Sequence, residues 1–265
     1  MKHLCRAIAY DMRRALSAYT GIAILMIPVC IVLDNPDAAE LIFMSSDISF
    51  AYLINYSMIS GGLYSRFVLV MLCALPYAAG FCAEYNTSFS VYMIPRTTEK
   101  AYFFSKYFVS VVLGSLVVTL GILLLYFITS FNLPLMQYDD FESFSVLPYY
   151  SRMRSHEDML FLRCTLYYNA LYGALWAAAA TCTSAYFTSP FVVMASPFIW
   201  SFLFTFILKA LRFPNDYRMD LWLNMSHILH SEEITMLLSA VFVAAAVLIM
   251  GYAYYRKGRR LMHGE

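Results

Sequence analysis

The polar stretch EYNTSFSVYMIPRTTEKAYFFSK, residues 84–106, holds the side chains of this chain that are best placed for specific chemistry. It carries the carboxylate of Glu84, the Pro95–Arg96 pair and the ammonium group of Lys106, between apolar runs of about membrane-helix length. Side chains of these types can form ion pairs and charge-assisted hydrogen bonds.

The insert itself has the pattern of two short helical segments. Thr87 or Ser88 is suited to cap a helix over about 86–95, and Pro95 ends it because the residue before a proline avoids helical geometry. Thr97 then caps a second helix, which continues through AYFFSKYF into the following apolar run.

Three large side chains of the first segment, Phe89, Tyr92 and Met93, are free to project from it. Exposed aromatic groups on a short helix indicate a groove on a partner protein. An ordinary interfacial loop with its aromatic groups in lipid fits the pattern equally well. The pattern alone leaves both interpretations open.

Catalytic and cofactor motifs are missing from the sequence. No G-x-x-x-x-G-K-[ST], G-x-S-x-G or H-E-x-x-H occurs, and no basic patch is large enough for a nucleic acid. His227 and His230 stand one helical turn apart, but they have no third ligand at metal-site spacing, so an exposed polar helix end is the favoured interpretation. We expect a chain that is not an enzyme and holds no metal or cofactor.

The composition is that of an integral membrane protein. Of 265 residues, 61% are hydrophobic and 13% are charged, and the mean hydropathy is +0.63. A soluble domain carries roughly 25% charged residues. The six cysteines lie in apolar runs or near the N-terminus, so no disulfide framework is indicated.

These features predict an all-α fold of one transmembrane domain over 1–265. Residues 1–20 have amphipathic spacing and are predicted to form an interfacial helix, although a simple basic flank of the first span also fits. Six apolar stretches approach the roughly 20 residues that a span requires. They are approximately 16–33, 62–83, 107–130, 163–187, 191–209 and 235–255.

The basic residues predict that both termini are cytoplasmic. With the N-terminus inside, eleven of the 18 lysines and arginines fall in inside segments. The loop 34–60 has four acidic residues and no lysine or arginine, as expected for an outside segment. The insert 84–106 then lies on the cytoplasmic side.

The span centres contain hydroxyl, aromatic and small residues, and the ionisable groups sit at span ends. This arrangement disfavours ion-coupled transport and intramembrane catalysis. The small residues of 170–185 allow close helix packing, within one subunit or between subunits. Four neighbouring side chains fit either a substrate path or a subunit interface: Tyr168, Asn169, Tyr172 and Trp176.

The layout resembles the ABC-2 type permeases, the membrane subunits of bacterial ABC exporters. Those proteins have an N-terminal amphipathic helix, six spans and both ends inside. After the second span they carry a glutamate, a short hydrophobic segment, a proline with a nearby basic residue and a lysine that opens the third span. The matching residues here are Glu84, YMIPR (92–96) and Lys106, while NTS stands where family members often have a glycine–threonine pair.

The resemblance implies a function in ATP-driven export from the plasma membrane of a bacterium. Residues 86–95 would be the coupling helix, and a separate ABC ATPase subunit would bind ATP and Mg. The residues that couple the chain to the ATPase would be Glu84, Phe89, Tyr92, Met93, Pro95, Arg96 and Lys106. Among them, the resemblance implies that Phe89, Tyr92 and Met93 are the contact anchors, and that Glu84 and Arg96 fix the pose of the coupling helix through hydrogen bonds or ion pairs. The turn around Thr188–Pro190 would make a lesser contact, and two permeases, copies or paralogues, would enclose the substrate path.

The apolar and aromatic character of the spans suits an amphipathic peptide or a lipid-like substrate. The alternative function is a membrane assembly or sensor subunit that works without an ATPase. That alternative explains the apolar spans and the amphipathic start but gives no reason for the Glu–Pro–Arg–Lys insert.

Overall fold

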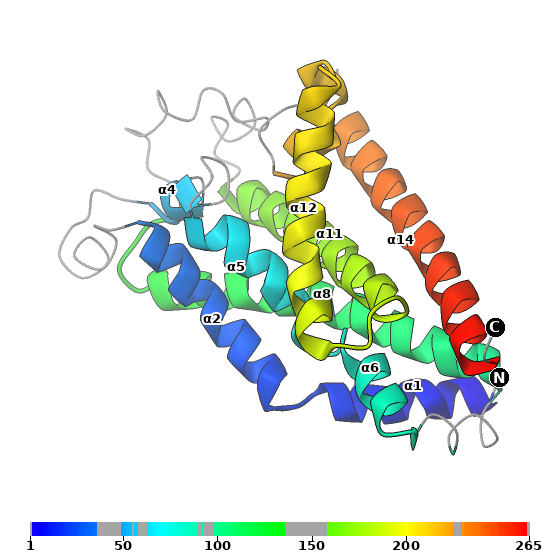
Figure 1. The fold of residues 1–265 in the computed structure, drawn as a ribbon. Helices are drawn as coiled ribbons and strands as arrows, with labels where there is room; N and C mark the ends of the chain where they lie inside the picture. Colours follow the sequence, from blue (N-terminus) through cyan, green and yellow to red (C-terminus); the bar gives the residue numbers. More distant parts are fainter. Residues whose placement is uncertain are drawn as a thin grey trace.

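A computed structural model describes residues 2–35, 49–54, 56–57, 63–89, 92, 98–135, 158–224, 229 and 231–263. The described part is helical and contains no strand, so the predicted all-α class is confirmed. Figure 1 shows a bundle of long helices with one helix, α1, lying across its end. The elements are α1 (Lys2–Ala15), α2 (Ala18–Asp34), α4 (Phe50–Ile54), α5 (Leu63–Ala74), α6 (Gly80–Asn86), α8 (Glu99–Thr129), α11 (Asp158–Ser184), α12 (Pro190–Ala210), η4 (Asn215–Tyr217), α13 (Met219–Leu223) and α14 (Glu232–His263).

Helix α8 is the centre of the bundle. It packs against α1, α2, α5, α11 and α14, and half of its most apolar window is buried inside the protein. Its closest neighbour is α11, where a Cβ on Gly173 would lie 2.4 Å from the carbonyl oxygen of Gly114. The Thr181 hydroxyl donates to Ser110 Oγ at 2.7 Å across the same interface. The small residues of 170–185 therefore serve helix packing within this chain.

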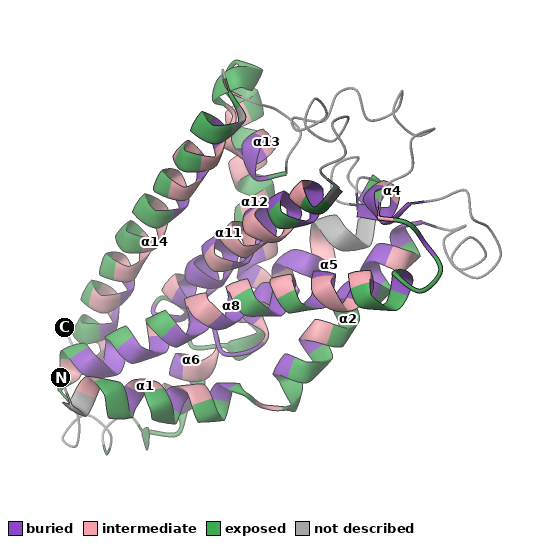
Figure 2. Cartoon of the chain, turned by 180° about the vertical axis from the view of Figure 1, so that it is seen from behind, coloured by how far each residue is buried: buried purple, intermediate pink, exposed green. Residues whose placement is uncertain are grey.

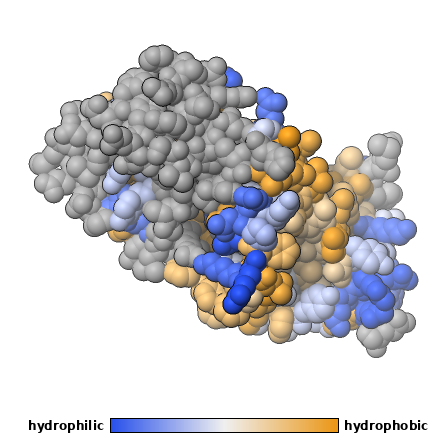
Figure 3. Space-filling view, turned by 90° about the horizontal axis from the view of Figure 1, so that it is seen from above, coloured by the Kyte–Doolittle hydropathy of each residue, from blue (hydrophilic) through white to orange (hydrophobic). Residues whose placement is uncertain are grey.

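Helices α12 and α14 lie at the periphery. Only 17% of the most apolar window of each is buried. Figure 2 shows exposed positions along both helices. Large apolar residues are among the exposed ones, such as Phe191, Phe202 and Leu248. Apolar side chains also form a continuous part of the surface seen in Figure 3. Surfaces of this composition are stable against lipid or another membrane subunit.

Within the residues that the structure describes, three helices, α8, α12 and α14, are long and apolar enough to cross a membrane, which is fewer than the six predicted spans. The number of candidate spans rises to four if the bent pair α1–α2 is counted as one span. The stretch 62–83 is divided into α5 and α6 because Pro76 interrupts the helix. Helix α11 is long, but its tyrosines, Asn169 and threonines lower its hydropathy.

The predicted helix over 1–20 ends at Ala15, and the chain turns by 59° before α2 begins at Ala18. The Thr20 hydroxyl donates to the Ala15 carbonyl at 2.5 Å across the bend. The two chain termini lie at the same end of the bundle (Figure 1). There, Arg259 of α14 approaches Glu99 of α8 at 3.6 Å.

Candidate functional site

Helix α1 carries an acidic residue on its buried face. Ile8, Met12 and Ala15 pack against Tyr77 and its apolar neighbours. Asp11 lies four residues before Ala15, so the helical repeat carries its carboxylate into the protein, where the residue is 4% exposed. Arg14, one turn further, lies at the edge of the same contact.

The interruption between α5 and α6 positions two further side chains of the site, Tyr77 and Glu84. The chain leaves helical geometry at residues 75–79, around Pro76, and Tyr77 turns its phenol towards α1. Glu84 follows on α6 and is 1% exposed. Helix α6 ends with Thr87 as its C-cap, and Ser88 adopts a positive φ of 56°. Thr87 therefore ends one helix, where the sequence pattern predicted that it would start another.

The first turns of α8 position the remaining side chains of the site. Thr98 caps this helix by accepting a hydrogen bond from the Ala101 amide at 3.3 Å, so the cap lies one residue after the predicted Thr97. Tyr102, Ser105 and Lys106 follow at spacings of three and four residues, which places them on one face of the helix. Each of these three is nearly fully buried.

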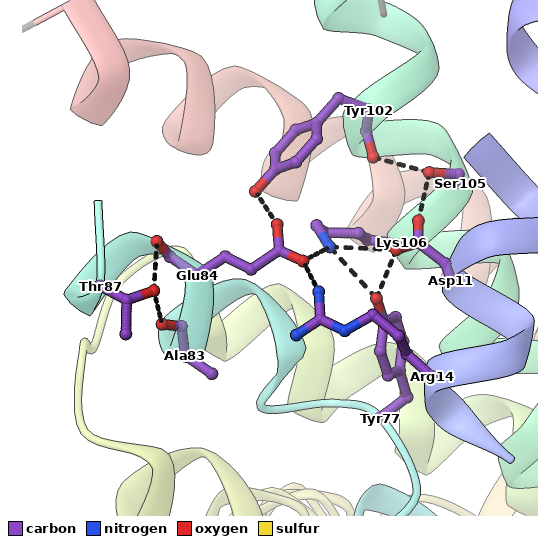
Figure 4. Close-up of polar contacts among 9 residues, drawn as sticks. All are labelled: Asp11, Arg14, Tyr77, Ala83, Glu84, Thr87, Tyr102, Ser105 and Lys106. Carbon is purple, nitrogen blue, oxygen red and sulfur yellow. Dashed lines mark hydrogen bonds and ion pairs between the residues drawn. The ribbon is translucent and has the colours of Figure 1, made fainter. Parts of the chain in front are cut away.

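Lys106 lies at the centre of a buried ion network (Figure 4). Its Nζ donates to Glu84 Oε1 at 2.7 Å, to Asp11 Oδ1 at 3.2 Å and to the Tyr77 hydroxyl at 3.1 Å. An ammonium group has three protons, so each of them has an acceptor. Its nitrogen also lies 4.9 Å from the centre of the Tyr102 ring.

The two carboxylates are equally well satisfied. The Tyr102 hydroxyl donates to Glu84 Oε2 at 2.8 Å, and the Arg14 guanidinium donates to Glu84 Oε1. Around Asp11, Oδ1 accepts from the Tyr77 hydroxyl at 2.5 Å and Oδ2 from the Ser105 hydroxyl at 2.6 Å. Two acidic and two basic side chains thus balance formally inside a fully hydrogen-bonded cluster, which we call the α1–α6–α8 network.

Such an arrangement holds segments together, because each carboxylate accepts hydrogen bonds from two other parts of the chain. The network joins α1, the α5–α6 connection, α6 and α8. For Arg14, burial is the largest single effect and lowers the pKa, but the Glu84 carboxylate, the Tyr77 and Tyr10 side chains and the hydrogen bond to Glu84 together raise it, so the net pKa lies above its ordinary value. The guanidinium therefore stays charged.

Arg14 connects the network to the surface. Its side chain is 39% exposed, and its guanidinium carbon lies 5.9 Å from the centre of the Phe89 ring. Phe89 and Tyr92, both predicted contact residues, are exposed, Tyr92 by 69%. Three other predicted contact residues, Met93, Pro95 and Arg96, lie outside the described residues.

The turn between α11 and α12 lies beside α6. The Asn86 side-chain amide donates to the Thr188 carbonyl at 2.9 Å, and the Cys82 thiol donates to the Phe187 carbonyl at 3.1 Å. This brings the predicted lesser contact, Thr188–Pro190, to the same end of the bundle as Phe89.

The second predicted group is part of α11. Tyr168 and Trp176 are buried within the bundle, and Asn169 donates its side-chain amide to the Thr165 carbonyl at 2.8 Å. The Tyr172 and Trp176 rings meet edge-on at 5.9 Å. Tyr168, Asn169 and Trp176 are thus buried and Tyr172 is half-buried, and the role of these side chains in a substrate path or a subunit interface stays a prediction.

Besides Glu84 and Lys106, the network has five members that sequence reasoning missed: Asp11, Arg14, Tyr77, Tyr102 and Ser105. One signal was present for the first of them, because an acidic residue on the apolar stripe of an amphipathic helix requires a buried partner. A second signal was the spacing of Tyr102, Ser105 and Lys106, which places these three side chains on one face of α8.

No group of three or more His, Cys, Asp or Glu side chains in the described residues could hold a metal ion, and His227 and His230 lie outside that part. Comparisons with protein-family models, with curated proteins and with solved structures found no match to this chain.

Proposed function

We propose that this chain is the membrane permease subunit of an ATP-driven bacterial exporter of the ABC-2 type. In this proposal the chain spans the plasma membrane six times with both termini in the cytoplasm. It pairs with a second permease, a copy or a paralogue, and binds a separate ABC ATPase that hydrolyses ATP. The substrate is an amphipathic peptide or a lipid-like molecule.

One observation carries the proposal. Phe89 and Tyr92 are exposed directly after α6, a helix whose Glu84 is held in the buried α1–α6–α8 network. An exposed aromatic pair on a firmly anchored element fits a protein–protein contact, because the anchor limits the entropy lost on binding. It also transmits force from the contact into the bundle.

The surroundings of this pair support the same function. The α11–α12 turn and both chain termini lie at the same end of the bundle (Figure 1). That end contains exposed basic residues such as Arg13, Lys100 and Arg260, as a cytoplasmic face does. A soluble ATPase on this side would reach Phe89, Tyr92 and the turn together.

The test is affinity purification of the full chain from its native membrane in mild detergent, followed by mass spectrometry. We expect a stoichiometric P-loop ATPase, and a second permease sequence if the pair is a heterodimer. Reproducible recovery of the intact chain without an ATPase would refute the proposal and favour the assembly or sensor function.

A matched pair of variants locates the contact. Tyr92→Asp should reduce ATPase recovery roughly tenfold or more, because a carboxylate would enter an apolar contact. Tyr217→Asp is the control, since Tyr217 is 54% exposed on the separate segment η4. Equal ATPase recovery with both variants would remove Tyr92 from the interface.

A further inference from the structure

Arg14 differs from the other members of the α1–α6–α8 network in its exposure. The Asp11, Glu84 and Lys106 side chains are at most 5% exposed, whereas that of Arg14 is 39% exposed. The guanidinium of Arg14 therefore lies between the buried network and the protein surface.

The contacts of Arg14 lead to different parts of the chain. It donates to Glu84 Oε1 at the end of α6, and its guanidinium carbon lies 5.9 Å from the Phe89 ring centre and 5.6 Å from that of Tyr10. A planar cation can hydrogen-bond a carboxylate at its edge while it stacks on an aromatic face. Arg14 thus joins α1 directly to the segment that carries Phe89.

Most hydrogen bonds of the network do not involve Arg14, which makes one of them, to Glu84. Without it, Glu84 keeps Lys106 on Oε1 and Tyr102 on Oε2, and all the partners of Asp11 remain. Removing Arg14 costs the network one hydrogen bond and one positive charge, and it also removes the connection from α1 to Phe89. A substitution that keeps the charge of Arg14, or one that changes only Phe89, therefore separates a positioning role from a role in balancing buried charge.

We propose that Arg14 is a positioning residue that fixes the segment bearing Phe89 and Tyr92 to α1. Displacement of this segment then moves α1 and, across the bend at residues 16–17, α2. Helix α2 packs closely on α8, where Gly121 leaves room for Ile27. The transmitting role rests on the proposed function, because the displacement would come from the ATPase, whereas the positioning itself does not.

The test measures the distance between α1 and this segment in the full chain without any partner. One spin label is attached to native Cys5, which is exposed on α1, and the other to a Tyr92→Cys substitution. Cys182 is replaced by serine because it is partly exposed, while the remaining four cysteines are buried. Pulsed electron paramagnetic resonance then gives the distance distribution in lipid nanodiscs.

Three variants remove the connection in different ways. R14Q removes the charge and the planar guanidinium. R14K keeps the positive charge but has no planar group to stack on a ring. Phe89→Leu removes only the aromatic ring that Arg14 contacts. We expect all three to increase the population outside the main distance peak roughly fivefold. R14K and Phe89→Leu should also keep the melting temperature of the parent protein, so a distance change would not reflect unfolding.

Arg13→Gln is the matched control, because Arg13 is exposed on the same helix and undergoes the same change of charge. Distributions for R14Q, R14K and Phe89→Leu that match Arg13→Gln would overturn the proposal. If R14Q fails to fold, R14K and Phe89→Leu still decide it. Broadened distributions together with a failed ATPase purification would leave Arg14 as a positioning residue and refute the exporter function.

Discussion

Lys106→Met is the substitution that tests the network most directly. It removes the ammonium group between Asp11 and Glu84 while a side chain of similar length fills the space. Glu84 keeps the guanidinium of Arg14, but Asp11 loses its cation in a site where its side chain is 5% exposed. The substitution therefore leaves one carboxylate buried without a compensating charge.

The magnitude follows from this burial. Removing one partner of a buried ion pair costs about 3–5 kcal/mol. For a protein of this size, 1 kcal/mol corresponds to roughly 2–4 °C, so the melting temperature should fall by about 6–20 °C. A thiol-reactive dye can follow unfolding of the purified chain, because Cys30, Cys73 and Cys164 are buried in the folded protein.

Two controls make the result interpretable. Lys100→Met changes an exposed lysine on the same helix and should shift the melting temperature by less than about 2 °C. The double variant Asp11→Asn, Lys106→Met removes both charges of the pair and should recover about 1–3 kcal/mol relative to additivity. Loss of stability no greater than that of Lys100→Met, or strict additivity, would refute the network as a source of stability.

Three further outcomes are expected. Gly173→Leu should lower stability by about 3 kcal/mol or more because even its Cβ would meet the Gly114 carbonyl, whereas Gly21→Ala, with nothing within 4 Å, should be neutral or stabilising in the same melting assay. Tyr107→Phe removes a hydroxyl that donates to a carbonyl of α14 at 2.5 Å, so it should lower the free energy of unfolding by about 1 kcal/mol. An unchanged unfolding midpoint in a guanidinium titration would contradict this. An impermeant maleimide should label Cys5 in inverted vesicles and not in intact cells; labelling from outside would reverse the proposed topology.

The relation between sequence and structure is clearest along α8. The prediction of a helix that runs from the polar insert into an apolar span agrees with the single helix Glu99–Thr129. Length and hydropathy also identify α12 and α14. These are local properties, since each residue adds its own transfer free energy to the segment in which it lies.

The prediction of one apolar span over 62–83 shows the limit of local reasoning. Apolar residues fill the stretch 62–83, yet Pro76 divides it, and Tyr77 at the break contributes its hydroxyl to a polar cluster. The hydropathy of a window does not reveal that a break within it is stabilised by contacts from other helices.

The sequence by itself determined the all-α membrane character of the protein and singled out Glu84 and Lys106 as unusual polar groups in apolar surroundings. Only the tertiary structure decided that they pair with each other and with Asp11, which lies 95 positions from Lys106. The physical reason is that burying a charge requires partners at fixed distances. Those distances depend on how α1, α6 and α8 pack together, and no single segment specifies that packing.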